Sequence, residues 1–220
     1  MKYIFFFVTV TNYLSCIAWN PKLYPYNPQI HNLGNNGLPG AAHSLIAPLF
    51  TKYLDYTVYG KNIREEVIES QDKNKSILDV GCGTGFSTSY NKNSLGLDAS
   101  EEMINTAKLI FPDKNFKHGH IEYWKPDKKY DITTIMFMFH EVPNFARKNI
   151  VEKIKEFTKE KIIVIDISPY YEPTPLMLSG EPYIDDYLKN IQTELRDFDE
   201  EIIVKNHVHK WTFAKHNNFT

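Results

Sequence analysis

A short apolar run that ends in a glycine-rich loop constrains the fold more than any other feature of this sequence. Residues 76–80 read Ser-Ile-Leu-Asp-Val, and glycines follow at positions 81, 83 and 85. An apolar run of this length that stops at glycines is typical of a buried parallel strand. Similar runs recur along the chain, at residues 94–98, 115–117, 132–137 and 161–167. Because helical spacing separates them, the sequence predicts an α/β fold with a doubly wound, mainly parallel sheet.

Several segments carry the marks of helices. Glu101–Ile110 is the clearest, because Ser100 can cap its start, acidic residues occupy its first turn and Pro112 follows its end. Apolar residues at helical spacing predict further helices, at residues 41–50, 62–70, 149–157 and 184–195. Two strand-like runs, at residues 201–208 and 210–214, predict a hairpin at the end of the chain.

The N-terminus differs from the rest of the chain. Lys2 precedes an apolar stretch, and small residues lead to Ala18, so residues 1–18 are typical of a secretory signal that is cut after Ala18. An uncleaved anchor or a core strand is the alternative, but the run is short for a membrane span, so we expect no stable span after removal of the leader. The leader indicates the secretory pathway, or a plastid reached by a bipartite leader, or the cytoplasm if it is not functional. Residues 19–40 predict an extended arm and residues 41–220 the folded domain.

The composition is that of a folded protein with one domain. The chain has 220 residues, of which 42% are hydrophobic and 24% charged, enough for one α/β domain with a full core. The formal charge of −2 and scattered lysines give no basic field, so we expect no nucleic-acid partner. Cys16 and Cys82 form no disulfide framework, and nothing in the sequence indicates a metal site or an oligomeric state.

The glycine loop can approach a ligand closely and point backbone N–H groups at it. A phosphate-binding Walker loop needs Gly-Lys-Ser/Thr, whereas residues 85–87 read Gly-Phe-Ser; a dinucleotide fingerprint needs glycine where Phe86 stands. Both alternatives are disfavoured. Asp98 ends the second predicted strand thirteen residues after Gly85. Because parallel strands end at one edge of the sheet, we expect its carboxylate beside the loop, where it can accept both hydroxyls of a ribose.

Two segments carry a resemblance to a known family. Residues 77–85, Ile-Leu-Asp-Val-Gly-Cys-Gly-Thr-Gly, and residues 96–103, Gly-Leu-Asp-Ala-Ser-Glu-Glu-Met, resemble class I methyltransferases, in particular the ubiquinone/menaquinone-biosynthesis-like ones. The resemblance implies S-adenosyl-L-methionine as cofactor and a seven-stranded Rossmann-like sheet with an antiparallel C-terminal strand. It also implies the cofactor contacts: the methionyl part at Asp79, Gly81, Cys82, Gly83, Thr84 and Gly85, the ribose at Asp98, and the adenine at Ala99 and Met103.

The chain departs from this family after the third predicted strand. Where the family commonly has an aspartate for the adenine amino group, residues 119–122 read Gly-His-Ile-Glu. Either His120 or Glu122 can make the polar contact, and Ile121 can supply a backbone amide and an apolar side. The short stretch between Phe86 and Leu95 also predicts a stunted first helix.

Candidate catalytic residues follow the fourth predicted strand. His140 should emerge at the same sheet edge as the glycine loop, and its imidazole titrates in the useful range. His140 or Glu141 is therefore the candidate base for an acceptor that must lose a proton. A structural histidine bonded to the following turn is the alternative for His140. Phe137, near the end of the strand, is expected to touch the methionyl chain.

The Pro-rich stretch at residues 168–183 lies where this fold usually builds its acceptor pocket. Tyr170, Tyr171, Met177 and Tyr183 can pack on an aromatic or lipid-like acceptor, or fill a minor core under a long loop. The sequence thus predicts an S-adenosylmethionine-dependent methyltransferase that acts on a small, apolar or aromatic acceptor. A non-catalytic protein that keeps the cofactor site and an NAD-dependent oxidoreductase are the alternatives.

Overall fold

The computed structural model describes residue 26 and residues 37–215 of the chain. The expected leader at residues 1–18 and most of the expected arm lie outside the described residues. The arm was expected to reach residue 40, but the first described helix, α2 (Gly37–Tyr59), already begins at Gly37. No helix in the described part of the chain is both long and apolar enough to cross a bilayer.

The described residues build a seven-stranded sheet in the order β3-β2-β1-β4-β5-β7-β6. The strands are β1 (Ile77–Val80), β2 (Leu95–Asp98), β3 (Phe116–His118), β4 (Tyr130–Met136), β5 (Thr158–Ile167), β6 (Asp199–Val204) and β7 (Val208–Ala214). The first five pair in parallel, whereas β7 runs antiparallel to β5 and forms a hairpin with β6. The predicted doubly wound sheet with an antiparallel C-terminal strand is confirmed.

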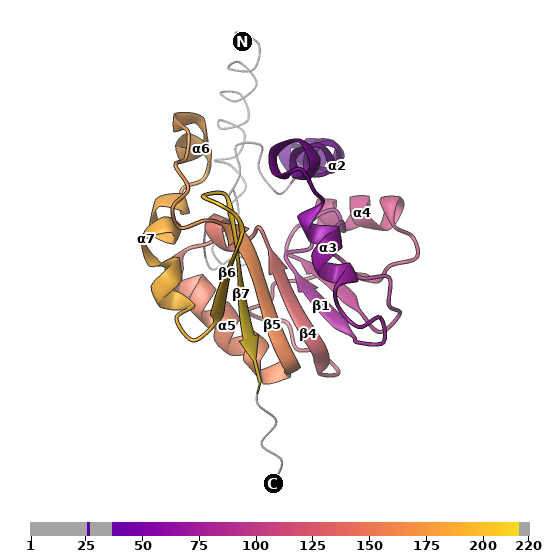
Figure 1. The fold of residues 1–220 in the computed structure, drawn as a ribbon. Helices are drawn as coiled ribbons and strands as arrows, with labels where there is room; N and C mark the ends of the chain where they lie inside the picture. The colour runs from indigo at the N-terminus through magenta and orange to yellow at the C-terminus, as the bar shows by residue number, and fades with distance from the viewer. Residues whose placement is uncertain (1–25, 27–36, 216–220) are drawn as a thin grey trace.

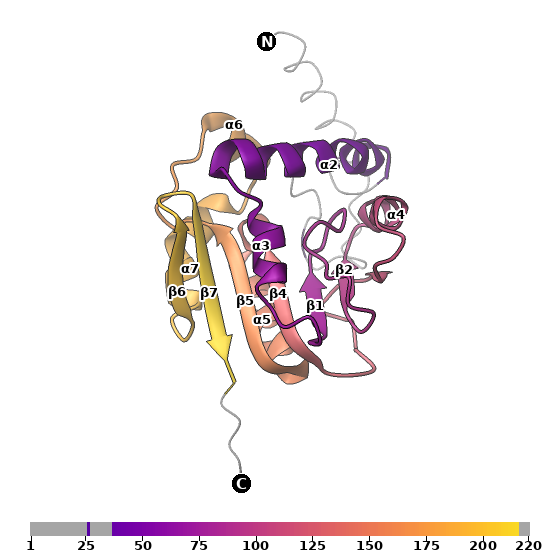
Figure 2. The same ribbon diagram turned by 45° about the vertical axis from the view of Figure 1, so that its right-hand side comes forward.

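Helices cover both faces of this sheet (Figures 1 and 2). They are α3 (Ile63–Glu69), α4 (Glu101–Ile110), α5 (Asn144–Phe157) and α7 (Ile184–Glu194), while the short helix α6 (Pro175–Gly180) lies beyond the carboxyl ends of the parallel strands. The larger core cluster joins the sheet to α5 and α7, and a smaller one joins it to Ile63 of α3 on the other face. Helix α2 lies across the carboxyl ends of the parallel strands, as Figure 2 shows, and packs mainly against α4.

The predicted helix Glu101–Ile110 is confirmed to the residue, and its cap forms as expected: the Ser100 hydroxyl accepts from the Met103 N–H at 3.2 Å. The predicted helix at 41–50 is part of the longer α2. The stunted helix expected after the glycine loop is missing altogether, because residues 81–94 form only turns. This stretch is rich in Ser, Thr and Asn, whose side chains bond locally and so compete with a helix.

A buried arginine ties α5 to α7. The Arg147 side chain is 1% exposed, and its guanidinium donates to the carboxylates of Glu194 and Asp186, each at 2.7 Å. It also donates to the Val142 carbonyl at 2.5 Å, so the turn before α5 depends on the same side chain. These bonds hold α5, α7 and the turn after β4 together at the carboxyl edge of the sheet.

Candidate functional site

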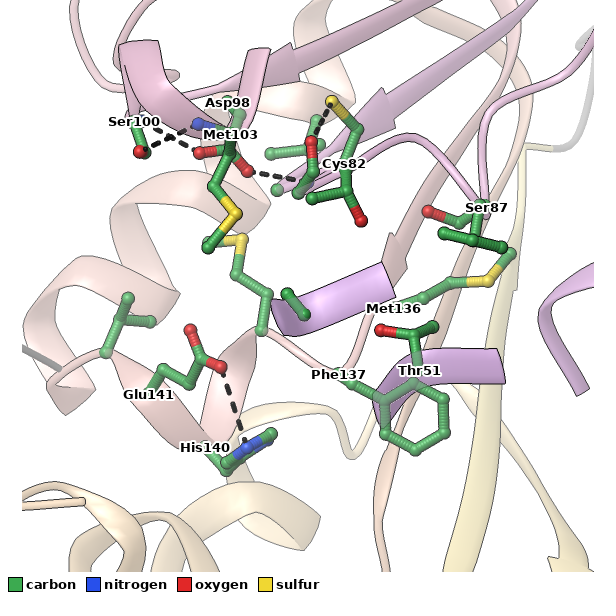
Figure 3. A pocket seen from close by; sticks show the side chains of 18 of the residues that line it. Thr51, Cys82, Ser87, Asp98, Ser100, Met103, Met136, Phe137, His140 and Glu141 are labelled. Atoms are coloured by element: carbon green, nitrogen blue, oxygen red, sulfur yellow. Dashed lines mark hydrogen bonds and ion pairs between the residues drawn. The ribbon is translucent and has the colours of Figure 1, made fainter. Parts of the chain in front are cut away.

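A cavity of about 590 Å³ opens at the carboxyl ends of the central strands, under α2. Strand β1 lies between β2 and β4, so the strand order reverses at this point. Ligands of open α/β sheets bind in the crevice that such a reversal creates. Figure 3 shows the cavity with Asp98 and Met103 on one side, and Phe137, His140 and Glu141 on the other.

The glycine loop forms one wall, and its glycines are required for different reasons. Gly81 and Gly85 have φ of 71° and 89°, and an added Cβ would lie 2.6 Å from Met138 Sδ at Gly81 and 2.6 Å from the Phe116 ring at Gly85. Gly83, with φ of 50°, would meet nothing within 4 Å. Gly83 therefore faces open space in which a ligand can approach the backbone.

Gly81, Cys82, Gly83 and Thr84 line the cavity, whereas Gly85 and Asp79 do not. The Asp79 carboxylate is fully buried and accepts from the hydroxyls of Ser87 and Thr88 at 2.8 and 2.7 Å. Burial raises its pKa, against the effect of these hydrogen bonds. Asp79 supports the loop from behind, and this position does not match the expected contact with a methionyl group.

Asp98 stands at the end of β2, beside the loop, as expected. Its Oδ2 accepts from the Gly83 N–H at 2.7 Å, and its Oδ1 accepts from the Ser100 N–H at 2.8 Å. Burial raises the pKa of Asp98 to about 6, although both backbone bonds favour the carboxylate. The carboxylate lines the cavity with lone pairs left over, so it can accept further hydrogen bonds from a ligand.

The adenine-end candidates gather at the same side of the cavity. Its lining includes Ala99, Met103, His120, Ile121 and Glu122. Burial, with a smaller effect of His118, lowers the pKa of His120, so its ring is neutral at pH 7. Burial raises the pKa of Glu122. The residues that replace the family's aspartate therefore do reach the cavity, and a neutral imidazole there offers both a donor and an acceptor.

His140 sits in a buried acidic cluster after β4, in the 3₁₀ turn η1 (Phe139–Glu141). Its Nδ1 lies 2.5 Å from Asp166 Oδ1, and its Nε2 lies 3.9 Å from Glu141 and 3.7 Å from Glu181. Burial disfavours a charge on the ring, but Asp166, Glu141 and Glu181 outweigh it and raise the pKa of His140 to about 9. At neutral pH the ring is an imidazolium, which donates protons and does not accept them.

Asp166 holds this turn in place. Its buried carboxylate accepts from the N–H groups of Phe139 and Ile167, both at 2.7 Å, in addition to the His140 ring. Both His140 and Glu141 line the cavity. The alternative, a structural histidine, thus agrees in part with the structure. The His140 ring is held by a hydrogen bond, but its partner is the Asp166 carboxylate of β5 and not the following turn.

Two of the four residues predicted for the acceptor pocket lie at the cavity, and two do not. Tyr171 and Met177 line the cavity, but Tyr170 and Tyr183 do not. Tyr170 is 61% exposed, with its ring 6.1 Å from that of His209. Tyr183 packs edge to face on Tyr26 at 6.4 Å. Met177 reaches the cavity from helix α6, whereas Tyr170 before this helix and Tyr183 after it do not.

Several residues of the cavity wall were not singled out from the sequence. They include Asp55 and Tyr59 of α2, Arg64 of α3, and His207 in the turn between β6 and β7. Phe137, which the sequence analysis did name, lines the cavity with a positive φ of 55°, a backbone conformation that is strained for a bulky side chain. No local motif marks Asp55, Tyr59, Arg64 or His207, because they meet only through the folding of distant segments.

Comparisons with known proteins agree with this geometry. Residues 77–169 match the model of a methyltransferase domain family. The chain is 31% identical over 115 residues to the putative methyltransferase 235L of Invertebrate iridescent virus 6, covering 41% of this chain and 43% of that protein. It is 30% identical over 119 residues to malonyl-[acyl-carrier protein] O-methyltransferase 2 of Ilyobacter polytropus, covering 49% and 45%. The chain thus matches less than half the length of these relatives.

A solved structure shares the fold over most of the chain. The TehB-like SAM-dependent methyltransferase of Corynebacterium glutamicum superposes with a TM-score of 0.54 at 15% identity. The superposition covers 80% of this chain and 99% of that one. At this identity the likeness concerns the fold.

Proposed function

We propose that this chain, whose residues 77–169 match the model of a methyltransferase domain, transfers the methyl group of S-adenosylmethionine to a small, apolar or aromatic acceptor. The observation that carries this proposal is the junction of β1 and β2. There Asp98 and the open backbone at Gly83 share one wall of a cavity large enough for a small-molecule ligand.

The residues present fit the cofactor. Asp98 would hold the ribose hydroxyls, Gly81 to Thr84 would lie along the methionyl part, and Met103 and Ile121 would flank the adenine. When bound, the cofactor supplies a methyl group on a positively charged sulfur. Transfer is an in-line displacement, so the protein acts mainly by orienting the acceptor and excluding water.

Glu141 is the proposed proton acceptor. Its carboxylate is 14% exposed and lines the cavity, and the imidazolium of His140 lies 3.9 Å from it. His140 is then a positioning residue: fixed by Asp166, it holds the neighbouring carboxylate through its charge. A base is needed only if the nucleophile of the acceptor carries a proton that must leave.

Two measurements on the full chain test the proposal. Calorimetry should detect binding of S-adenosylhomocysteine and none of NAD(H). Incubation of a metabolite extract with methyl-labelled cofactor should yield labelled product and S-adenosylhomocysteine. Binding without turnover on any extract would favour a non-catalytic protein, and binding of NAD(H) alone would favour an oxidoreductase.

A further inference from the structure

The cavity continues past the cofactor residues into a chamber with aromatic walls. Tyr59 at the end of α2 stacks on Phe137 after β4, with ring centroids 6.3 Å apart and planes 9° from parallel. Tyr171, after β5, meets His207 edge to face at 5.8 Å. All four rings line the same cavity. Such walls favour a ligand with a planar, apolar body, because ring faces and edges pack well on aromatic groups.

A buried ion pair forms part of this chamber. Arg64 Nη1 of α3 donates to Asp55 Oδ1 of α2 at 2.6 Å, and the two side chains are 17% and 4% exposed. The guanidinium carbon also lies 4.2 Å from the centre of the Phe137 ring. Both side chains line the cavity, so the pair belongs to the wall of a binding site as well as to the junction between two helices.

The second oxygen of this carboxylate is left over. Asp55 Oδ2 is buried and has no hydrogen-bond partner within the part of the chain that the structure describes. Buried polar atoms are nearly always hydrogen-bonded, and an exception beside a cavity points to a ligand as the missing partner. Because a carboxylate oxygen only accepts, that ligand must bring a donor.

Charge balance restricts what the donor can be. Arg64 already neutralises Asp55 through Oδ1, so an ammonium group at Oδ2 would add a positive charge to a buried pair that is complete. Burying a charge without a counter-ion costs far more than burying a neutral group that is hydrogen-bonded. A neutral hydroxyl or ring N–H satisfies Oδ2 without this cost.

We propose that the chamber holds a planar, mainly apolar acceptor and recognises one uncharged hydrogen-bond donor on it through Asp55 Oδ2. That this ligand is the methyl acceptor rests on the proposed function. The contact itself does not depend on turnover. It fixes one end of the acceptor, at α2 and α3, and leaves the rest of the molecule to extend toward the methyl donor and Glu141.

Three probes with the same ring system test the contact. 2-Naphthol carries a neutral donor, 2-methoxynaphthalene carries none, and 2-naphthylmethylamine carries a positive charge at pH 7. Their affinities are measured by calorimetry on the full chain, with and without S-adenosylhomocysteine. We expect 2-naphthol to bind at least about tenfold more tightly than either of the others, as a hydrogen bond to a charged group implies. Equal affinities, preference for the amine or no binding of any probe would overturn the inference.

The variant Asp55→Asn sharpens the test. Arg64 Nη1 is a donor, so the asparagine oxygen stays on it and the NH₂ group takes the place of Oδ2. An acceptor is thereby exchanged for a donor at constant shape. The preference for 2-naphthol should disappear or invert in favour of the ether, while Glu69→Gln, an exposed change on α3, should leave it unchanged.

The outcomes separate the two proposals. A preference for 2-naphthol that survives in Asp55→Asn would refute the role of Asp55. If Asp55→Asn does not fold, as judged from its melting curve, the three probes on the unmodified chain decide. If the unmodified chain does not bind S-adenosylhomocysteine, the proposed function is refuted. The preference among the three probes, measured without S-adenosylhomocysteine, then still shows whether Asp55 Oδ2 accepts a hydrogen bond from the ligand.

Discussion

The Asp98 carboxylate provides the sharpest test of the cofactor site. Its two oxygens each hold one backbone N–H, from Gly83 and Ser100, and have lone pairs left for the two ribose hydroxyls. A hydrogen bond to a charged group contributes about 1.5–3 kcal/mol. Loss of two such bonds in Asp98→Ala therefore costs at least about 3 kcal/mol, or roughly a hundredfold in affinity for S-adenosylhomocysteine.

Calorimetry with two ligands shows whether the ribose is the group lost. In the unmodified chain, 2′-deoxy-S-adenosylhomocysteine should bind about tenfold more weakly than S-adenosylhomocysteine, because one hydroxyl is gone. In Asp98→Ala the two ligands should bind alike. The matched control is Glu101→Gln, an exposed change one turn away that does not touch the cavity. Unchanged affinity in Asp98→Ala, or an equal penalty for the deoxy ligand in both proteins, would refute the ribose assignment.

Three further perturbations probe the rest of the site and its support. Glu141→Gln should lower turnover by about a hundredfold or more and leave the affinity for S-adenosylhomocysteine unchanged; an unaffected rate would exclude Glu141 as proton acceptor. The native pKa of His140, about 9, lies above its ordinary 6.5, so its stabilisation is complete below pH 6.5 and is lost as the pH rises through 9. Urea unfolding should therefore show the unmodified chain losing about 3 kcal/mol more than His140→Gln between these limits, and parallel pH profiles would contradict the pairing with Asp166. Arg147→Ala should cost about 3–5 kcal/mol because it leaves buried carboxylates unpaired, whereas Arg196→Ala, 76% exposed at its side chain, should cost less than about 0.5 kcal/mol; similar losses would exclude a special role for Arg147.

Local sequence predicted well that Asp98 lies beside the glycine loop. The glycine loop, the strand before it and Asp98 lie within a short stretch, and parallel pairing of β1 with β2 brings their carboxyl ends together. The pairing of these two neighbouring strands is therefore enough to place Asp98 beside the loop. The same reasoning placed His140 and Glu141 correctly at the edge of the sheet.

The orientation of the Asp79 carboxylate and the charge of the His140 ring were harder to predict. The position of Asp79 before the glycines suggested a ligand contact, but Ser87 and Thr88 turn back and occupy its carboxylate. The ordinary pKa of histidine suggested a base at position 140. Only the fold shows that Asp166 of β5 lies 2.5 Å from its ring and keeps it charged.

Strand periodicity and the placement of the glycines predicted the α/β class and the meeting of Asp98 with the glycine loop, because both patterns act over a few neighbouring residues. The antiparallel C-terminal strand followed from the family resemblance. The cavity wall beneath α2 depends on the tertiary structure. Asp55, Tyr59, Arg64 and His207 come from segments up to about 150 residues apart, and only their packing around one cavity brings them together. Burial then sets the chemistry of Asp55. On an exposed helix its carboxylate would be hydrated, but here Oδ2 is buried without a hydrogen-bond partner among the described residues.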